Sequence, residues 1–135
     1  MRNVLTGFFL VLVLAGLAAA ENPVLSVAGS GLPGTPLTFT VKGSSVPNQV
    51  AFLGISPLPG KTDFGFVVMD LAWPIFASGM GSLNKGEVKH QIVVPASWPP
   101  FLTIPMYAQS VVVVPKGAGY QVVTTNVVKF LIKGQ

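Results

Sequence analysis

Hydrophobic and polar residues alternate along much of the chain after residue 20. From Leu37 to Lys42, for example, leucine, phenylalanine and valine alternate with two threonines and a lysine. A period of two predicts a β-strand with one buried and one solvated face. The same alternation recurs in the stretches 87–94, 103–114 and 128–133. The chain is therefore expected to be built from strands.

Two further runs, 49–55 and 64–71, are apolar at nearly every position, which is typical of more central strands. A first strand is expected at 24–28. Clusters of glycine, proline and serine separate these stretches and predict turns. The turn clusters are residues 29–34, 56–60, 79–82, 97–100 and 116–119.

About seven short strands joined by turns predict an all-β fold, a two-sheet antiparallel β-sandwich of the immunoglobulin-like kind. A small closed barrel is the alternative. No hairpin dipeptide such as Asn-Gly fixes an individual turn, so the sequence leaves the strand order open.

The first twenty residues have the plan of a secretory signal peptide. Arg2 supplies the basic start, residues 7–17 are apolar, and Ala18-Ala19-Ala20 forms a small-residue cleavage site before Glu21. A membrane anchor would need about 20 apolar residues, and this run is shorter. We expect cleavage after Ala20, a single domain over 21–135, and a secreted product in the extracellular space, at the cell surface or in the periplasm. Membrane contact is expected only during export.

Charged residues make up 9% of the chain, against about 25% in ordinary soluble domains. Arg2 is the only arginine, and the seven lysines are scattered. Nucleic-acid recognition relies on arginine forks and basic clusters, so no nucleic-acid partner is expected. The absence of cysteine excludes disulfides, thiolate zinc sites, thiol catalysis and lipid attachment to an N-terminal cysteine.

Four pieces of the sequence stand in an order and spacing that carry a resemblance: Pro36–Val41, Phe52–Ser56, Met106–Gln109 and Thr125–Phe130. Over 33–133 the chain resembles a sandwich module of bacterial secreted and cell-envelope proteins. In those proteins the module often forms the C-terminal part of a larger extracellular chain, whereas here we expect it to stand alone. The resemblance implies the sandwich and the extracellular setting, and it carries over no functional residue.

Catalytic chemistry finds little support in the sequence. The acids are few and scattered, no Gly-x-Ser-x-Gly elbow is present, and His90 is the only histidine. His90 lies on the apolar side of its strand, which favours a packed, hydrogen-bonded histidine. One histidine without thiolates makes a poor metal site. We therefore expect no enzyme, no cofactor and no metal; a hydrolase with an unrecognised site is the weakest alternative.

Aromatic residues beside prolines are the best functional candidates. Trp73 and Phe76 flank one turn, and Trp98 and Phe101 flank another. Such rings either cap the ends of the core or form an exposed patch. The candidate patch favours a non-enzymatic structural or protein-interaction domain that binds another envelope or extracellular protein, or itself. A carbohydrate-binding module that uses the tryptophans is the alternative, although the apolar flanks favour protein.

Overall fold

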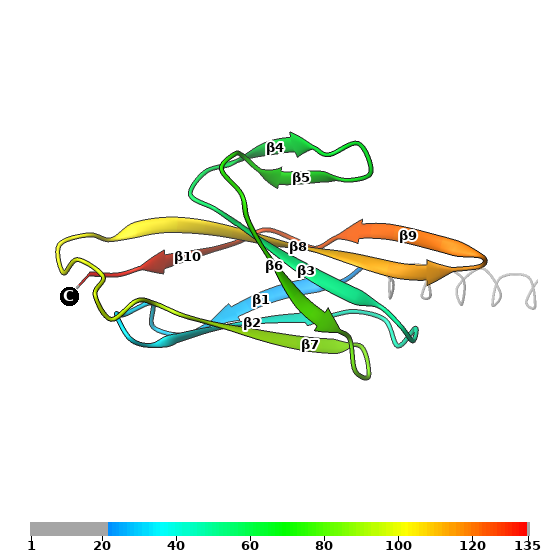
Figure 1. Cartoon of the computed structure of the whole chain (residues 1–135), viewed down its shortest axis with the longest axis horizontal. Helices are drawn as coiled ribbons and strands as arrows, with labels where there is room; N and C mark the ends of the chain where they lie inside the picture. The colour runs from blue at the N-terminus through cyan, green and yellow to red at the C-terminus, as the bar shows by residue number, and fades with distance from the viewer. Residues whose placement is uncertain (1–21, 135) are drawn as a thin grey trace, which may run out of the picture.

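The computed structural model describes residues 22–134, so the predicted signal peptide and its cleavage site lie outside the described residues. Within this range the chain is all-β and has no helix, which confirms the predicted fold class; no described segment could cross a membrane as a helix. Figure 1 shows the strands in their layers. They are β1 (Val24–Ala28), β2 (Pro36–Lys42), β3 (Val50–Ser56), β4 (Pro59–Asp63), β5 (Val68–Leu71), β6 (Phe76–Ser82), β7 (Glu87–Val93), β8 (Ile104–Lys116), β9 (Gly119–Thr124) and β10 (Val128–Ile132).

The described range holds ten strands, not the predicted seven. The run 64–71 is not one central strand: a turn interrupts it, and β4 and β5 form a hairpin. In that turn Gly65 has a positive φ of 87°, and its amide donates to Oδ1 of Asp63 at 2.7 Å. A short aspartate side chain that bonds the backbone two residues on favours a turn over a continuing strand.

The predicted turn at 79–82 was also wrong, because these residues belong to β6. The pairing of β3 with β6 shifts register at Ala51 and Phe52, and Gly81 has a φ of 109°. A β-bulge accommodates the extra residue and the positive φ. Met80 can then point into the core.

All strand pairs are antiparallel, and most of them belong to two sheets. The smaller sheet has the order β1-β2-β7, and the larger has the order β10-β8-β3-β6. Strand β8 is long enough to pair with β3 along one edge and with both β10 and β9 along the other. The 13-residue strand β8 is therefore the common partner of three strands of the larger sheet.

A single core joins the two sheets. Phe39 of β2 and Phe130 of β10 meet edge to face, with ring centroids 5.3 Å apart. The other buried apolar residues of this core are Leu25, Leu37, Val41, Ala51, Leu53, Met80, Leu83, Val94, Met106, Ala108 and Val112. A second, smaller core of Met69, Leu71 and Val111 lies where the β4–β5 hairpin covers the outer face of the larger sheet. The hairpin is the top layer in Figure 1.

Candidate interaction surface

The hairpin is held on the larger sheet by a buried amide. Gln109 of β8 is only 1% exposed, and its Oε1 accepts from the backbone N–H of Asp70 at 2.8 Å. Its Nε2 donates to the carbonyl oxygen of Thr125 at 2.8 Å and to Oδ2 of Asp70 at 3.4 Å. One side chain therefore ties β5 to the sheet beneath it.

The base of the hairpin is hydrogen-bonded to Ser56 and packs on Gly54. The amide of Leu58 donates to Oγ of Ser56 at 3.1 Å, and the same hydroxyl donates to the carbonyl oxygen of Ala72, where the chain leaves the hairpin. A Cβ atom at Gly54 would lie 2.8 Å from Cε of Met69. The absence of a side chain at Gly54 thus allows the hairpin to pack directly on the backbone of β3.

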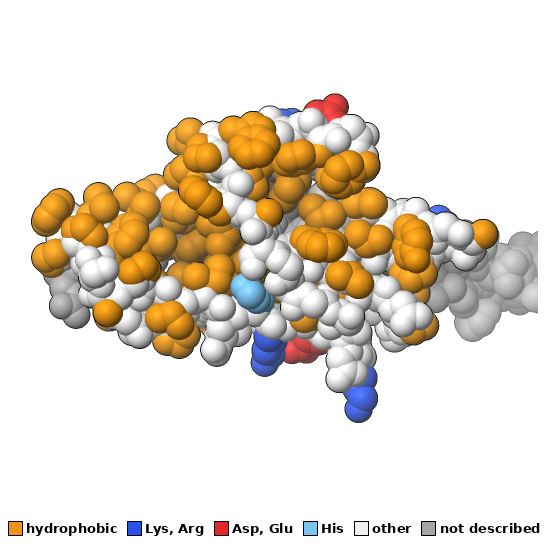
Figure 2. Space-filling model, viewed as in Figure 1, with side chains coloured by type: hydrophobic (Ala, Val, Ile, Leu, Met, Phe, Trp, Pro, Cys, Tyr) orange, Lys and Arg blue, Asp and Glu red, His pale blue; other side chains and the backbone are white. Residues whose placement is uncertain are grey.

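An apolar groove separates the hairpin tip from the outer face of the larger sheet. Its volume is about 300 Å³, and we call it the hairpin groove. Every side chain that lines it is apolar. They are Phe52, Ala77, Val111 and Val113 on the sheet and Phe64, Phe66, Val67 and Met69 on the hairpin. In Figure 2 hydrophobic side chains gather over the hairpin and the sheet below it, while charged side chains lie at the margins.

Three aromatic rings at this groove are largely open to solvent. Phe66 is 72% exposed, Trp73 63% and Phe52 46%. Trp73 meets Phe64 edge to face at 5.9 Å between centroids, and Phe64 lies 6.3 Å from Phe66. The rings of the hairpin thus support one another. We call Phe52, Phe64, Phe66 and Trp73, together with the groove, the hairpin face.

The four aromatic residues singled out in the sequence lie in two places. Trp73 belongs to the hairpin face, and Phe76, 63% exposed, starts the edge strand β6. Phe76 pairs with Ile55, which pairs with Ala108 of β8. Trp98 and Phe101 precede Ile104, the first residue of β8 and four residues before Ala108. Four strand residues at about 3.3 Å each span roughly 13 Å. Trp98 and Phe101 are therefore separated from Phe76 by that length of β8 and by part of a loop.

Trp98 and Phe101 also differ in burial. Trp98 is half-buried, packs against the main core, and donates its indole N–H to the carbonyl oxygen of Leu102 at 2.6 Å. This agrees with the interpretation of Trp98 as a cap on the core. Phe101, in contrast, is 87% exposed.

Sequence reasoning did not select Phe52, Phe64 and Phe66, which contribute most of the hairpin face. The signal that could have found them is Asp63-Phe64-Gly65-Phe66, an aspartate and a glycine that enclose one phenylalanine and precede another. This spacing favours a turn that carries two aromatic rings. Phe52 becomes part of the face only because the hairpin folds over β3.

The titratable residues His90 and Glu87 each contact another side chain of the fold. His90 pairs with the fully buried Phe39, is half-buried, and has its Nε2 3.2 Å from Oγ of Ser78. This is a packed and hydrogen-bonded histidine, as expected. Glu87 lies 3.7 Å from the ammonium of Lys89. Over residues 22–134 no group of three or more His, Asp or Glu residues is arranged to hold a metal ion.

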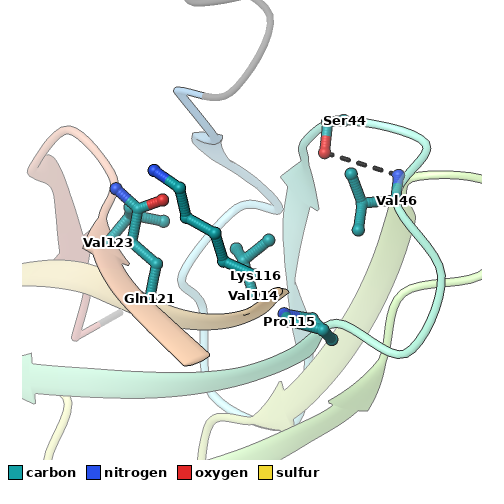
Figure 3. A pocket seen from close by; sticks show the side chains of 7 residues that line it. All are labelled: Ser44, Val46, Val114, Pro115, Lys116, Gln121 and Val123. Atoms are coloured by element: carbon teal, nitrogen blue, oxygen red, sulfur yellow. Dashed lines mark hydrogen bonds between the residues drawn. The ribbon is translucent and has the colours of Figure 1, made fainter. Parts of the chain in front are cut away.

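Two other hollows are smaller or more polar. One, of about 50 Å³, lies between the loop after β2 and the β8–β9 end, with Ser44 and Val46 on one side and Lys116 and Gln121 on the other (Figure 3). It has room for one or two water molecules. The other lies between the β1–β2 connection and β10 and includes Lys129 and Lys133. Neither collects aromatic rings as the hairpin groove does.

Comparisons with protein-family models, with curated proteins and with solved structures found no match to this chain. The resemblance to the bacterial envelope module therefore stays a prediction.

Proposed function

We propose that this chain is a secreted, non-enzymatic β-sandwich domain of the immunoglobulin-like kind, and that its hairpin face binds a protein partner outside the cytoplasm. The observation that carries the proposal is the hairpin groove, a purely apolar groove bordered by exposed aromatic rings. Two sheets with separate edge strands and one shared core support the sandwich over the closed alternative.

Exposed aromatic surface of this kind is costly to leave in water. At roughly 200 Å² for a whole aromatic side chain, the exposed fractions of Phe52, Phe66 and Trp73 amount to about 360 Å². Contiguous patches of about 300–600 Å² are the largest on ordinary monomers and are often functional. Tryptophan is also among the residue types most enriched at the positions that dominate binding energy in protein interfaces, and Trp73 is 63% exposed.

The hairpin is prepared for binding because its backbone is already fixed. Gln109 bonds Asp70 of β5, Ser56 bonds Ala72 just after β5, and Thr62 of β4 donates to the carbonyl oxygen of Leu71 at 2.7 Å across the hairpin. A surface that is rigid before binding loses little conformational entropy when a partner docks.

Carbohydrate binding is the second candidate, and the exposure of Trp73 favours it. A sugar, however, needs polar side chains beside the ring to bond its hydroxyl groups. None lines the hairpin groove. The polar side chains of Ser56, Thr62 and Gln109 are already engaged in hydrogen bonds within the fold. The balance of these contacts supports a protein partner.

Site-specific photo-crosslinking in the producing cells tests the proposal. A photoreactive residue replaces Phe66 on the hairpin face or, as a control, Gln91, an exposed residue of β7 in the smaller sheet. We expect protein adducts from position 66 and few from position 91. Equal labelling at both positions, or none at position 66, would contradict the proposal. Binding of soluble glycans that is lost in Trp73→Ala would instead favour the carbohydrate alternative.

A further inference from the structure

We propose that the partner of the hairpin face is a second copy of this chain, and that two copies pair face to face about a twofold axis. This inference rests on the proposed function and names its partner. In a twofold contact the same patch occurs on both sides. The patch must therefore complement itself in shape, area and charge.

The shape condition is met by one residue and the groove beside it. Phe66 lines the hairpin groove and is also 72% exposed. Each copy thus offers a protruding ring and, next to it, an apolar hollow of about 300 Å³. Two copies in a twofold arrangement can each place the ring of Phe66 against the groove of the other.

Most of the apolar area that such an interface needs is present. A standard interface buries about 800 Å² on each partner, of which about 56–65% is apolar. This corresponds to roughly 500 Å² of apolar surface on each side. The exposed rings of Phe52, Phe66 and Trp73 supply about 360 Å² of it. The partly exposed Val67 and Val113 of the groove and its exposed Ala77 extend the same surface.

The hairpin face differs from the rest of the surface in the signs of its charges. The β4–β5 hairpin carries Lys61, Asp63 and Asp70, so its charged side chains include both signs. The remainder of the described chain carries six lysines against the single acid Glu87. A twofold contact brings a patch against itself, so a patch of one sign would repel its copy. The hairpin face avoids that repulsion, and Lys61 of one copy can face an aspartate of the other.

The test is sedimentation velocity of the exported protein over a wide concentration range, with two matched variants. Phe66→Ser removes the protruding ring of the hairpin face. Phe101→Ser removes a ring that is even more exposed, at 87%, but lies before β8 and off this face. We expect a concentration-dependent dimer for the native chain, dissociation constants raised about 30-fold or more by Phe66→Ser, and no change for Phe101→Ser.

A third variant keeps the test valid if Phe66→Ser fails to fold. Lys61→Glu changes an exposed side chain and leaves a hairpin whose charges are all negative. It should weaken the dimer at low salt and less at high salt, because salt screens exposed charges.

Three results would overturn the inference: a monomer at every concentration, a dimer weakened by Phe101→Ser but not by Phe66→Ser, or a dimer indifferent to Lys61→Glu at low salt. A monomer that still gives adducts with another protein at position 66 would reject self-pairing and keep the proposed function. No adduct there would reject both.

Discussion

Gln109 gives the sharpest prediction about how the hairpin is held. Replacing it with leucine preserves much of the side-chain volume and removes all of its side-chain hydrogen bonds. The backbone N–H of Asp70 and the carbonyl oxygen of Thr125 then lose the partner that they have in the native protein. Leucine is otherwise suited to the site, because Gln109 is 1% exposed. The expected loss of stability therefore reflects the lost hydrogen bonds and not a change in packing.

The magnitude follows from which groups remain buried. A buried polar group left without a partner costs about 1–3 kcal/mol. Thr125 is 5% exposed and bears this cost in full, whereas water can replace the partner of the exposed Asp70. We expect a loss of about 2 kcal/mol in the free energy of unfolding for Gln109→Leu. At about 4 °C per kcal/mol for a domain of this size, the midpoint falls by roughly 8 °C.

Chemical denaturation measures the global loss, and native-state hydrogen exchange locates it. The amide of Asp70 should exchange much faster in Gln109→Leu, because the side-chain oxygen that accepts its hydrogen is gone. Gln91→Leu is the matched control: Gln91 is exposed and makes one side-chain bond, to Thr38, at 3.3 Å. Its effect should stay within about 0.5 kcal/mol. If Gln109→Leu is as stable as the control, or protects the Asp70 amide as well as the native chain does, the reasoning fails.

Three further predictions concern stability and processing. Gly31→Ala should cost about 2 kcal/mol or more in chemical denaturation, because its φ is 76° and its new Cβ would collide with the carbonyl oxygen of Leu131; Gly79→Ala, with open space around it, should cost much less. Trp98→Ala should lower the thermal midpoint, with a loss of about 2 kcal/mol from its half-buried ring, and a midpoint equal to that of the native chain would show that the ring does not cap the core. N-terminal sequencing of the exported protein should begin at Glu21, and recovery of the uncleaved chain from membranes would contradict the predicted signal peptide.

The strands whose two faces differ could be predicted from the sequence. The alternation from Leu37 to Lys42 gave β2, in which Leu37, Phe39 and Val41 are buried. The run 64–71 could not be assigned in the same way, because its apolar residues are divided between the hairpin turn and the short strand β5, in which only Met69 and Leu71 are buried. The bond between Asp63 and Gly65 and the positive φ of Gly65 mark the turn.

The candidate surface was less predictable than the fold. Trp73 and Phe76 are exposed, as an interaction patch requires, but the burial of Trp98 depends on where its loop crosses the core. The groove depends on residues far apart in sequence: Phe52 faces it from β3 and Val113 from β8. Their contribution arises from the folding of the hairpin over the larger sheet, which no local pattern encodes.

Asn126 lies between β9 and β10, and its side chain bonds the backbone of the edge strand β1. This contact bears on strand pairing between molecules in concentrated solution. Oδ1 of Asn126 accepts from the backbone N–H of Leu25 at 2.9 Å, and its Nδ2 donates to the carbonyl oxygen of the same residue at 3.1 Å. Strand β1 is an edge strand, and free backbone groups on such an edge can template the addition of a strand from another molecule. The carboxamide occupies both backbone groups of Leu25, the second residue of β1. A strand from another molecule could therefore pair with this part of the edge only by displacing the side chain of Asn126.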